Sequence, residues 1–147
     1  MTKEEQLQHV HDLIAVARDG ELGYRTAAEH VNDSHLSEIF AEYAKQRAGF
    51  VQELSSVVEE TPADSGTFTG AVFRGWMNLK SAVTGGGPEA IVAACETGED
   101  SAQAAYERVV NLDASGKLRT VAESQLEKIR EAHRRMLHLK TQYQHTA

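Results

Sequence analysis

The chain has 147 residues, of which 41% are hydrophobic and 25% are charged, and both fractions are close to those of ordinary globular proteins. Only two prolines and 6% aromatic residues are present, which argues against a β-sandwich and against a disordered chain. The formal net charge of -7 repels phosphate backbones and anionic lipid, so neither nucleic acid nor a membrane is an expected partner.

The beginning of the chain, MTKEEQLQHV, has no apolar signal-peptide core. No stretch approaches the roughly 18 apolar residues that a membrane span requires. The sequence therefore predicts a cytoplasmic protein. The single cysteine, Cys95, excludes an intramolecular disulfide and a thiolate zinc cluster, and it is expected to be a small buried side chain.

Residues 3–31 are predicted to form a helix, because apolar side chains recur there at alternating steps of three and four. Thr2 followed by Glu5 is typical of the capping box at a helix start. After a short turn of Asn, Asp and Ser, the same period predicts a second helix over residues 34–60. So short a turn requires the two helices to be antiparallel neighbours.

Residues 61–87 are rich in glycine and are predicted to be a long connection. Apolar residues within this stretch share one helical face, which predicts a short helix near 70–83 with Trp76 as its packing anchor. Proline at the first helical position then favours a third long helix over 88–112. A fourth is predicted over 116–143, and these two form a second antiparallel hairpin.

A connection of about 27 residues can run the length of a helix of about 40 Å and return the chain to the end that it left. The second and third long helices would then run parallel, as in ferritin-like bundles. The sequence thus predicts one all-α domain, residues 1–147, built as an antiparallel four-helix bundle. An up-and-down bundle with a decorated loop is the alternative.

Three stretches carry a family resemblance: DGELGYRTAAEHV at 19–31, GAVFRGWMNLKSAVTG at 70–85 and ACETGEDSAQAAYERVV at 94–110. Together they resemble a bacterial family of ferritin-like four-helix-bundle proteins, the domain of unknown function 2383. The resemblance covers nearly the whole chain in order. It implies a ferritin-like fold without an assigned reaction, in a wider group that includes oxidases, iron stores and proteins that hold no metal.

Glu21 lies in the apolar register of the first helix, where a buried carboxylate needs a partner. At 1.5 Å per residue, Glu21 lies roughly 17 Å from the first turn. Residues 42–47, Glu99 and residues 130–133 are expected at the same height on the other three helices. Polar residues from all four helices are therefore expected to meet in the middle of the bundle.

One interpretation of this layer is a metal site, because carboxylate and imidazole ligands from facing helices build the sites of ferritin-like bundles. The candidate ligands are Glu21, Glu42, Gln46, Glu96, Glu99 and His133. The ion would be iron or another divalent metal, with oxygen or peroxide as co-substrate and a stress-associated role. The Glu-x-x-His spacing of di-iron helices is absent, so one metal, or none, is expected rather than a pair.

The other interpretation is a non-catalytic helical structural or protein-interaction module. Glu21 would then pair with Arg47 or Arg130 and fix the register of the helices. The working surface would be the face of a homodimer or a higher homo-oligomer. The third long helix carries small residues that permit close helix approach, namely Ala90, Ala93, Ala94 and Ala104.

Overall fold

The computed structural model describes residues 2–59, 75–112 and 116–145. In these ranges it contains five helices and no strand, which confirms the predicted all-α class. The helices are α1 (Lys3–His30), α2 (Ser34–Val57), α3 (Asn78–Gly85), α4 (Pro88–Asn111) and α5 (Gly116–His145). None of these helices has the length and apolar character needed to cross a membrane.

The four long helices begin at the predicted residues, and local chemistry explains the starts of α1 and α4. The Thr2 hydroxyl accepts a hydrogen bond from the amide of Glu5 at 3.1 Å at the start of α1. Pro88 occupies the first turn of α4, directly after Gly87. α2 ends at Val57, before the predicted residue 60, because Glu59 adopts a left-handed φ of 57° that interrupts the helix.

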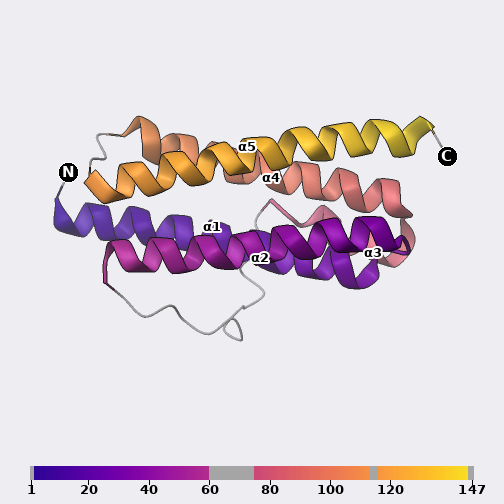
Figure 1. Ribbon diagram of the computed structural model, residues 1–147, viewed down its shortest axis with the longest axis horizontal. Helices are drawn as coiled ribbons and strands as arrows, with labels where there is room; N and C mark the ends of the chain where they lie inside the picture. Colours follow the sequence, from indigo (N-terminus) through magenta and orange to yellow (C-terminus); the bar gives the residue numbers. More distant parts are fainter. Residues whose placement is uncertain (1, 60–74, 113–115, 146–147) are drawn as a thin grey trace.

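The helices form two antiparallel hairpins, α1–α2 and α4–α5, which pack against each other (Figure 1). α2 and α4 run in the same direction. The beginnings of both helices, with Leu36 and Ile91, lie in one hydrophobic cluster, and their later halves, with Leu54 and Val109, lie in the other. This arrangement confirms the predicted parallel course of the second and third long helices.

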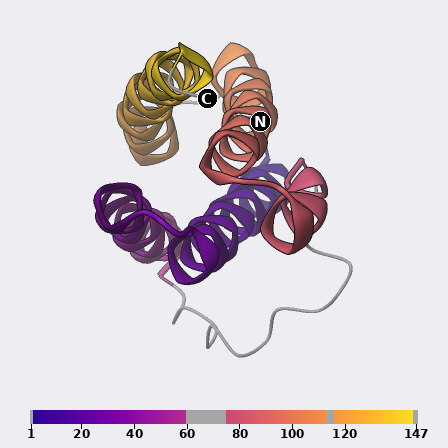
Figure 2. The same cartoon turned by 90° about the vertical axis from the view of Figure 1, so that its right-hand side faces the viewer.

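The short helix differs from its prediction. Residues 70–74 lie outside the described part, and α3 begins at Asn78, so Trp76 precedes the helix rather than lying on its face. The difference arises at Gly75, whose φ of 82° turns the chain before α3 begins. α3 lies on the outside of the bundle, beside α1 and α4 (Figure 2).

Trp76 is nevertheless the anchor of this segment, as predicted, because it is only 1% exposed. Its indole fits between α1 and α4 over two glycines. A Cβ atom added at Gly98 would lie 2.2 Å from Cε2 of the indole, and one added at Gly23 would lie 2.4 Å from Cε3. Neither glycine can therefore carry a side chain unless the indole moves.

Replacing the anchor tests how firmly α3 is held. Trp76→Ala should lower the free energy of unfolding by about 3 to 5 kcal/mol, since it removes a large buried aromatic contact and leaves a cavity. Chemical denaturation measures the change. Met77→Ala is the matched control, because this neighbouring side chain is 76% exposed and its loss should change stability by less than about 0.5 kcal/mol. Equal effects of the two substitutions would contradict the packing described.

Asp33 connects the α1–α2 turn to the last turns of α5. One carboxylate oxygen accepts a hydrogen bond from the amide of Leu36 at 3.0 Å, and the other accepts one from the Tyr143 hydroxyl at 2.7 Å. The Leu36 amide, followed by the Tyr143 hydroxyl, lowers the pKa of Asp33. The same carboxylate raises the pKa of Tyr143 to about 12. The Leu36 amide and the Tyr143 hydroxyl therefore stabilise the fold by binding the ionised carboxylate of Asp33.

Because its pKa is lowered on folding, Asp33 stabilises the protein above its ordinary pKa of about 4, and this stabilisation is lost as the pH falls through the lowered value. At pH 7, Asp33→Asn should therefore reduce the free energy of unfolding by about 0.3 to 1 kcal/mol, since asparagine keeps the cap but not the charge. Urea denaturation at a series of acidic pH values should show that the difference in unfolding free energy between the original protein and the variant shrinks below about pH 4. A difference that stays constant down to pH 2 would contradict this account.

Candidate functional site

The centre of the bundle holds a buried ion pair between α2 and α4. Arg47 is 1% exposed, and Glu99 is fully buried. The guanidinium donates two parallel hydrogen bonds, from Nη1 to Oε1 at 2.5 Å and from Nη2 to Oε2 at 2.7 Å. Its Nε donates a third, to the side-chain oxygen of Gln46 at 3.2 Å. Two parallel bonds of this kind fix both the distance and the orientation of the pair.

Two aromatic rings lie close to the guanidinium. The central carbon of Arg47 lies 5.4 Å from the ring centroid of Tyr24 and 5.4 Å from that of Phe50. Burial acts to lower the pKa of Arg47, but the charge and hydrogen bonds of Glu99 outweigh it and raise the pKa above its ordinary value. The guanidinium is therefore a permanent cation that neutralises Glu99 in the middle of the core.

Two other ionisable groups lie close to this pair. Burial, followed by the charge of Glu99, raises the pKa of the Tyr24 hydroxyl and of the Cys95 thiol well above their ordinary values. Both groups consequently remain protonated at neutral pH, and neither offers an anionic ligand. Cys95 is buried, as predicted. The Tyr24 hydroxyl has no hydrogen-bond partner among the described residues.

Glu21 is buried as predicted, at 5% exposure, but its predicted partner was wrong. It pairs with Arg25, one turn further along α1, and not with Arg47 or Arg130. It lies beside Lys45 in a shallow groove between α1 and α2. A carboxylate next to an arginine four residues later can be neutralised on its own helix, and so Glu21 does not reach the central layer.

Glu42 and Gln46 belong to α2. Glu42 is exposed, and both residues line a hollow between α2 and α5 together with Arg135. The predicted ligands therefore lie in several separate places rather than in one central cavity. Glu99 is engaged by Arg47, Glu21 lies between α1 and α2, and only two of the six predicted residues converge with a further potential ligand.

Those two residues are Glu96 and His133, and the third is Asp100. The Nε2 atom of His133 lies 2.8 Å from Oδ1 of Asp100 and 3.7 Å from Oε1 of Glu96. One potential ligand atom from each of the three residues lies within 4.8 Å of the other two. The sequence interpretation missed Asp100 as a ligand. The signal was its spacing of four from Glu96, which places both carboxylates on one face of α4.

This α4–α5 cluster of Glu96, Asp100 and His133 is partly buried and partly exposed to solvent. The side chains of Glu96 and His133 are 16% and 18% exposed, whereas that of Asp100 is 62% exposed. The Nε2 atom of His133 is itself buried and makes no well-aligned hydrogen bond, despite its short distance from Asp100. A ring nitrogen and two carboxylates thus face one another at the edge of solvent, an arrangement that can hold a cation.

The two buried glutamates provide a matched test of the central ion pair. Glu99→Gln should lower the free energy of unfolding by about 3 to 5 kcal/mol, because it leaves the buried guanidinium of Arg47 without a counter-charge. Glu21→Gln should cost less than about 1 kcal/mol, because Arg25 is 44% exposed and solvent screens the pair.

The double variant Arg47→Met with Glu99→Leu should regain most of the stability that Glu99→Gln loses, because it removes both charges together. Thermal and urea denaturation measure all three variants. A small effect of Glu99→Gln would show that the pair contributes little to the fold.

Comparison with known proteins identifies the family but not a reaction. A search of the curated proteins found no match. The family model described as "Domain of unknown function (DUF2383)" matches residues 5–112. This range contains the Arg47–Glu99 pair, Trp76 and the two carboxylates of the α4–α5 cluster, and it ends before α5 and His133. The match spans well over half of the chain, and the protein therefore belongs to this family of unknown function.

Proposed function

We propose that this protein binds one divalent transition-metal ion through Glu96, Asp100 and His133. The observation that carries the proposal is the convergence of one imidazole nitrogen and two carboxylate oxygens, from two helices, within 4.8 Å of one another. Imidazole and carboxylate ligands suit zinc, iron and manganese. With a neutral imidazole the ligand set carries two negative charges, which a divalent ion balances.

Small movements of the three side chains would complete the coordination geometry of the ion. Ligand distances to zinc are about 2.0 to 2.2 Å, so an ion between the three atoms requires the carboxylates to turn slightly toward it. Asp100 is largely exposed and is free to change rotamer at little cost. Three protein ligands leave at least one coordination position for water or a small molecule, which is the pattern of reactive rather than purely structural metal sites.

We also propose that the bundle is ferritin-like. The parallel course of α2 and α4, with a long connection between them, supports this relationship. The central layer differs from the ligand arrangement of a di-iron site, because a guanidinium neutralises the buried carboxylate there. A single ion at the flank, between α4 and α5, is therefore a better match to these residues than a metal pair in the centre.

A second candidate function is a non-catalytic structural or homodimerising module. The observation that favours it is the Arg47–Glu99 pair, which behaves as a device that fixes the register of α2 against α4. In that case His133, Glu96 and Asp100 form an ordinary cluster of polar contacts that holds α5 to α4. Metal binding decides between the two candidates.

Calorimetric titration of the purified metal-free chain with Zn²⁺, Mn²⁺ and, without oxygen, Fe²⁺ is the direct test. We expect one ion per chain and a rise in the unfolding temperature as the ion concentration exceeds the dissociation constant. His133→Ala should weaken binding by about 100-fold or more, beyond the 10- to 100-fold that is typical of residues outside the ligand set. Asp100→Asn should weaken it by a smaller factor, since asparagine keeps one oxygen.

His138→Ala is the matched control, because His138 is an exposed histidine of the same helix, outside the cluster. It should leave the affinity unchanged. Absence of saturable binding of all three ions, or equal losses of affinity from the two histidine substitutions, would sink the metal proposal and leave the structural module as the better account.

A further inference from the structure

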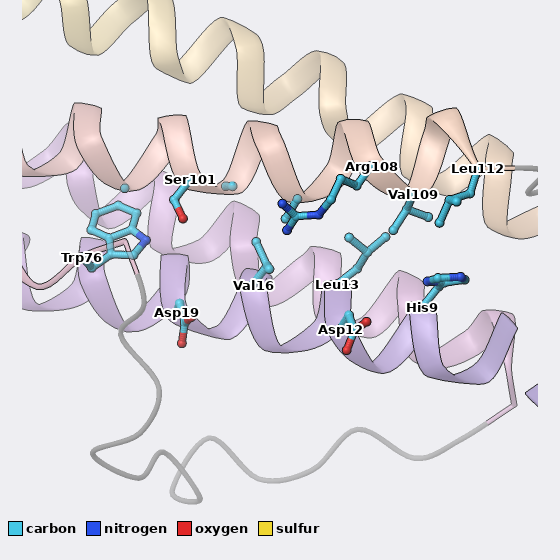
Figure 3. A pocket seen from close by; sticks show the side chains of 13 residues that line it. His9, Asp12, Leu13, Val16, Asp19, Trp76, Ser101, Arg108, Val109 and Leu112 are labelled. Carbon is cyan, nitrogen blue, oxygen red and sulfur yellow. The ribbon is translucent and has the colours of Figure 1, made fainter. Parts of the chain in front are cut away.

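A second feature of the molecule is independent of the α4–α5 cluster. It is a groove between α1 and α4, with a volume of about 430 Å³. This α1–α4 groove has Trp76 at one end and His9 and Leu112 at the other (Figure 3), and Gly98 lies against the indole of Trp76. Its volume lies in the range of about 300 to 1,000 Å³ that is typical of small-molecule sites.

The floor of the groove is apolar. Along α1 it is formed by Leu13 and Val16, and along α4 by Ala102, Ala105 and Val109. The two alanines on α4 leave space that larger side chains would fill. The indole of Trp76, which is wedged over Gly98, closes the inner end. The result is an elongated apolar trough between two helices.

One cation projects into this trough. Arg108 extends from α4 toward Val16 (Figure 3), and no ion pair is found for it among the described residues. The carboxylates of Asp12 and Asp19 lie along the α1 edge in the same view. Asp12 also accepts a hydrogen bond from the side chain of Gln8 at 2.9 Å. A ligand with a negatively charged group would therefore place that group on the α4 side of the groove, beside Arg108.

We propose that the α1–α4 groove binds a single-chain amphiphile with a carboxylate head, of the medium-chain fatty-acid type. The guanidinium of Arg108 binds the carboxylate, for which its planar pair of donors is well suited. The alkyl chain lies over the apolar floor and points toward Trp76. The lining residues along α4 extend from Gly98 to Leu112, a run of about 21 Å, so the groove as a whole is long enough for an extended chain of this kind.

Decanoate, at concentrations where it is monomeric, is the probe. Calorimetric titration of the full chain should show saturable binding of one molecule per chain. Trp76 is the only tryptophan, so its emission reports the arrival of the alkyl chain at the inner end of the groove. Octanoate, which is shorter by two methylenes, should bind about 15-fold more weakly, since each buried methylene contributes roughly a fourfold change in affinity.

Two pairs of variants separate head-group recognition from tail binding. Arg108→Ala should weaken decanoate binding about tenfold or more. Arg119→Ala should not, because Arg119 is exposed on α5 and paired with Glu123. Ala105→Phe should block the groove, whereas Ala104→Phe adds the same side chain at the neighbouring exposed position, outside the groove. Circular dichroism of each variant establishes that it is folded.

The proposal is overturned if decanoate gives no saturable heat, or if Ala105→Phe binds it as well as the original chain does. It is also overturned if decylamine, which has an amine head on the same alkyl chain, binds more tightly than decanoate, because the groove would then be recognising a cation through its aspartates. Binding without any change in Trp76 emission would contradict the stated direction of the alkyl chain.

Discussion

The buried pair of Arg47 and Glu99 constrains the rest of the bundle. Removing one partner leaves an unpaired charge in the core, which is among the most costly defects that a fold can carry. The two parallel hydrogen bonds therefore set the height of α2 against α4. Helix α1 leaves room for the guanidinium by having a glycine there, since a Cβ atom added at Gly20 would lie 3.2 Å from Nη1 of Arg47. Three helices are thus positioned by one interaction.

The connection to α3 depends on the same region. Gly23 lies three residues after Gly20 on α1, and Gly98 directly precedes Glu99 on α4. The glycines on these facing turns of α1 and α4 therefore leave space for both the guanidinium of Arg47 and the indole of Trp76. Tyr24 contacts both groups, with its ring centroid 5.0 Å from that of Trp76 and 5.4 Å from the guanidinium carbon. The buried ion pair and the indole therefore share one aromatic neighbour in the core.

The sequence was sufficient to predict the four long helices and their connectivity, because helix caps, the proline at a helix start and the spacing of apolar residues act locally. It predicted the height of the polar layer correctly but assigned its partners wrongly. Periodicity places Glu21 on an inward face, yet it cannot tell whether a carboxylate reaches across the core or back to Arg25 on its own helix. Asp100 was missed as a ligand, although its spacing of four from Glu96 places both carboxylates on one face of α4. Trp76 was recognised as an anchor, but the turn at Gly75 depends on backbone conformation that the apolar pattern does not encode.

Four consecutive residues of α4 show how one helical turn can serve different purposes. Successive side chains are rotated by about 100° around the helix. Gly98 therefore receives Trp76, Glu99 faces the core, Asp100 faces His133, and Ser101 lines the α1–α4 groove.

Because the guanidinium of Arg47 already neutralises Glu99, the central layer needs no metal to be stable. The ligand atoms that remain available lie at the flank, where water can complete the coordination of an ion. An ion bound there would stabilise α5 against α4, whereas an occupant of the groove would stabilise α1 against α4. The ion and the groove ligand would thus stabilise two different helix contacts made by the same turn of α4.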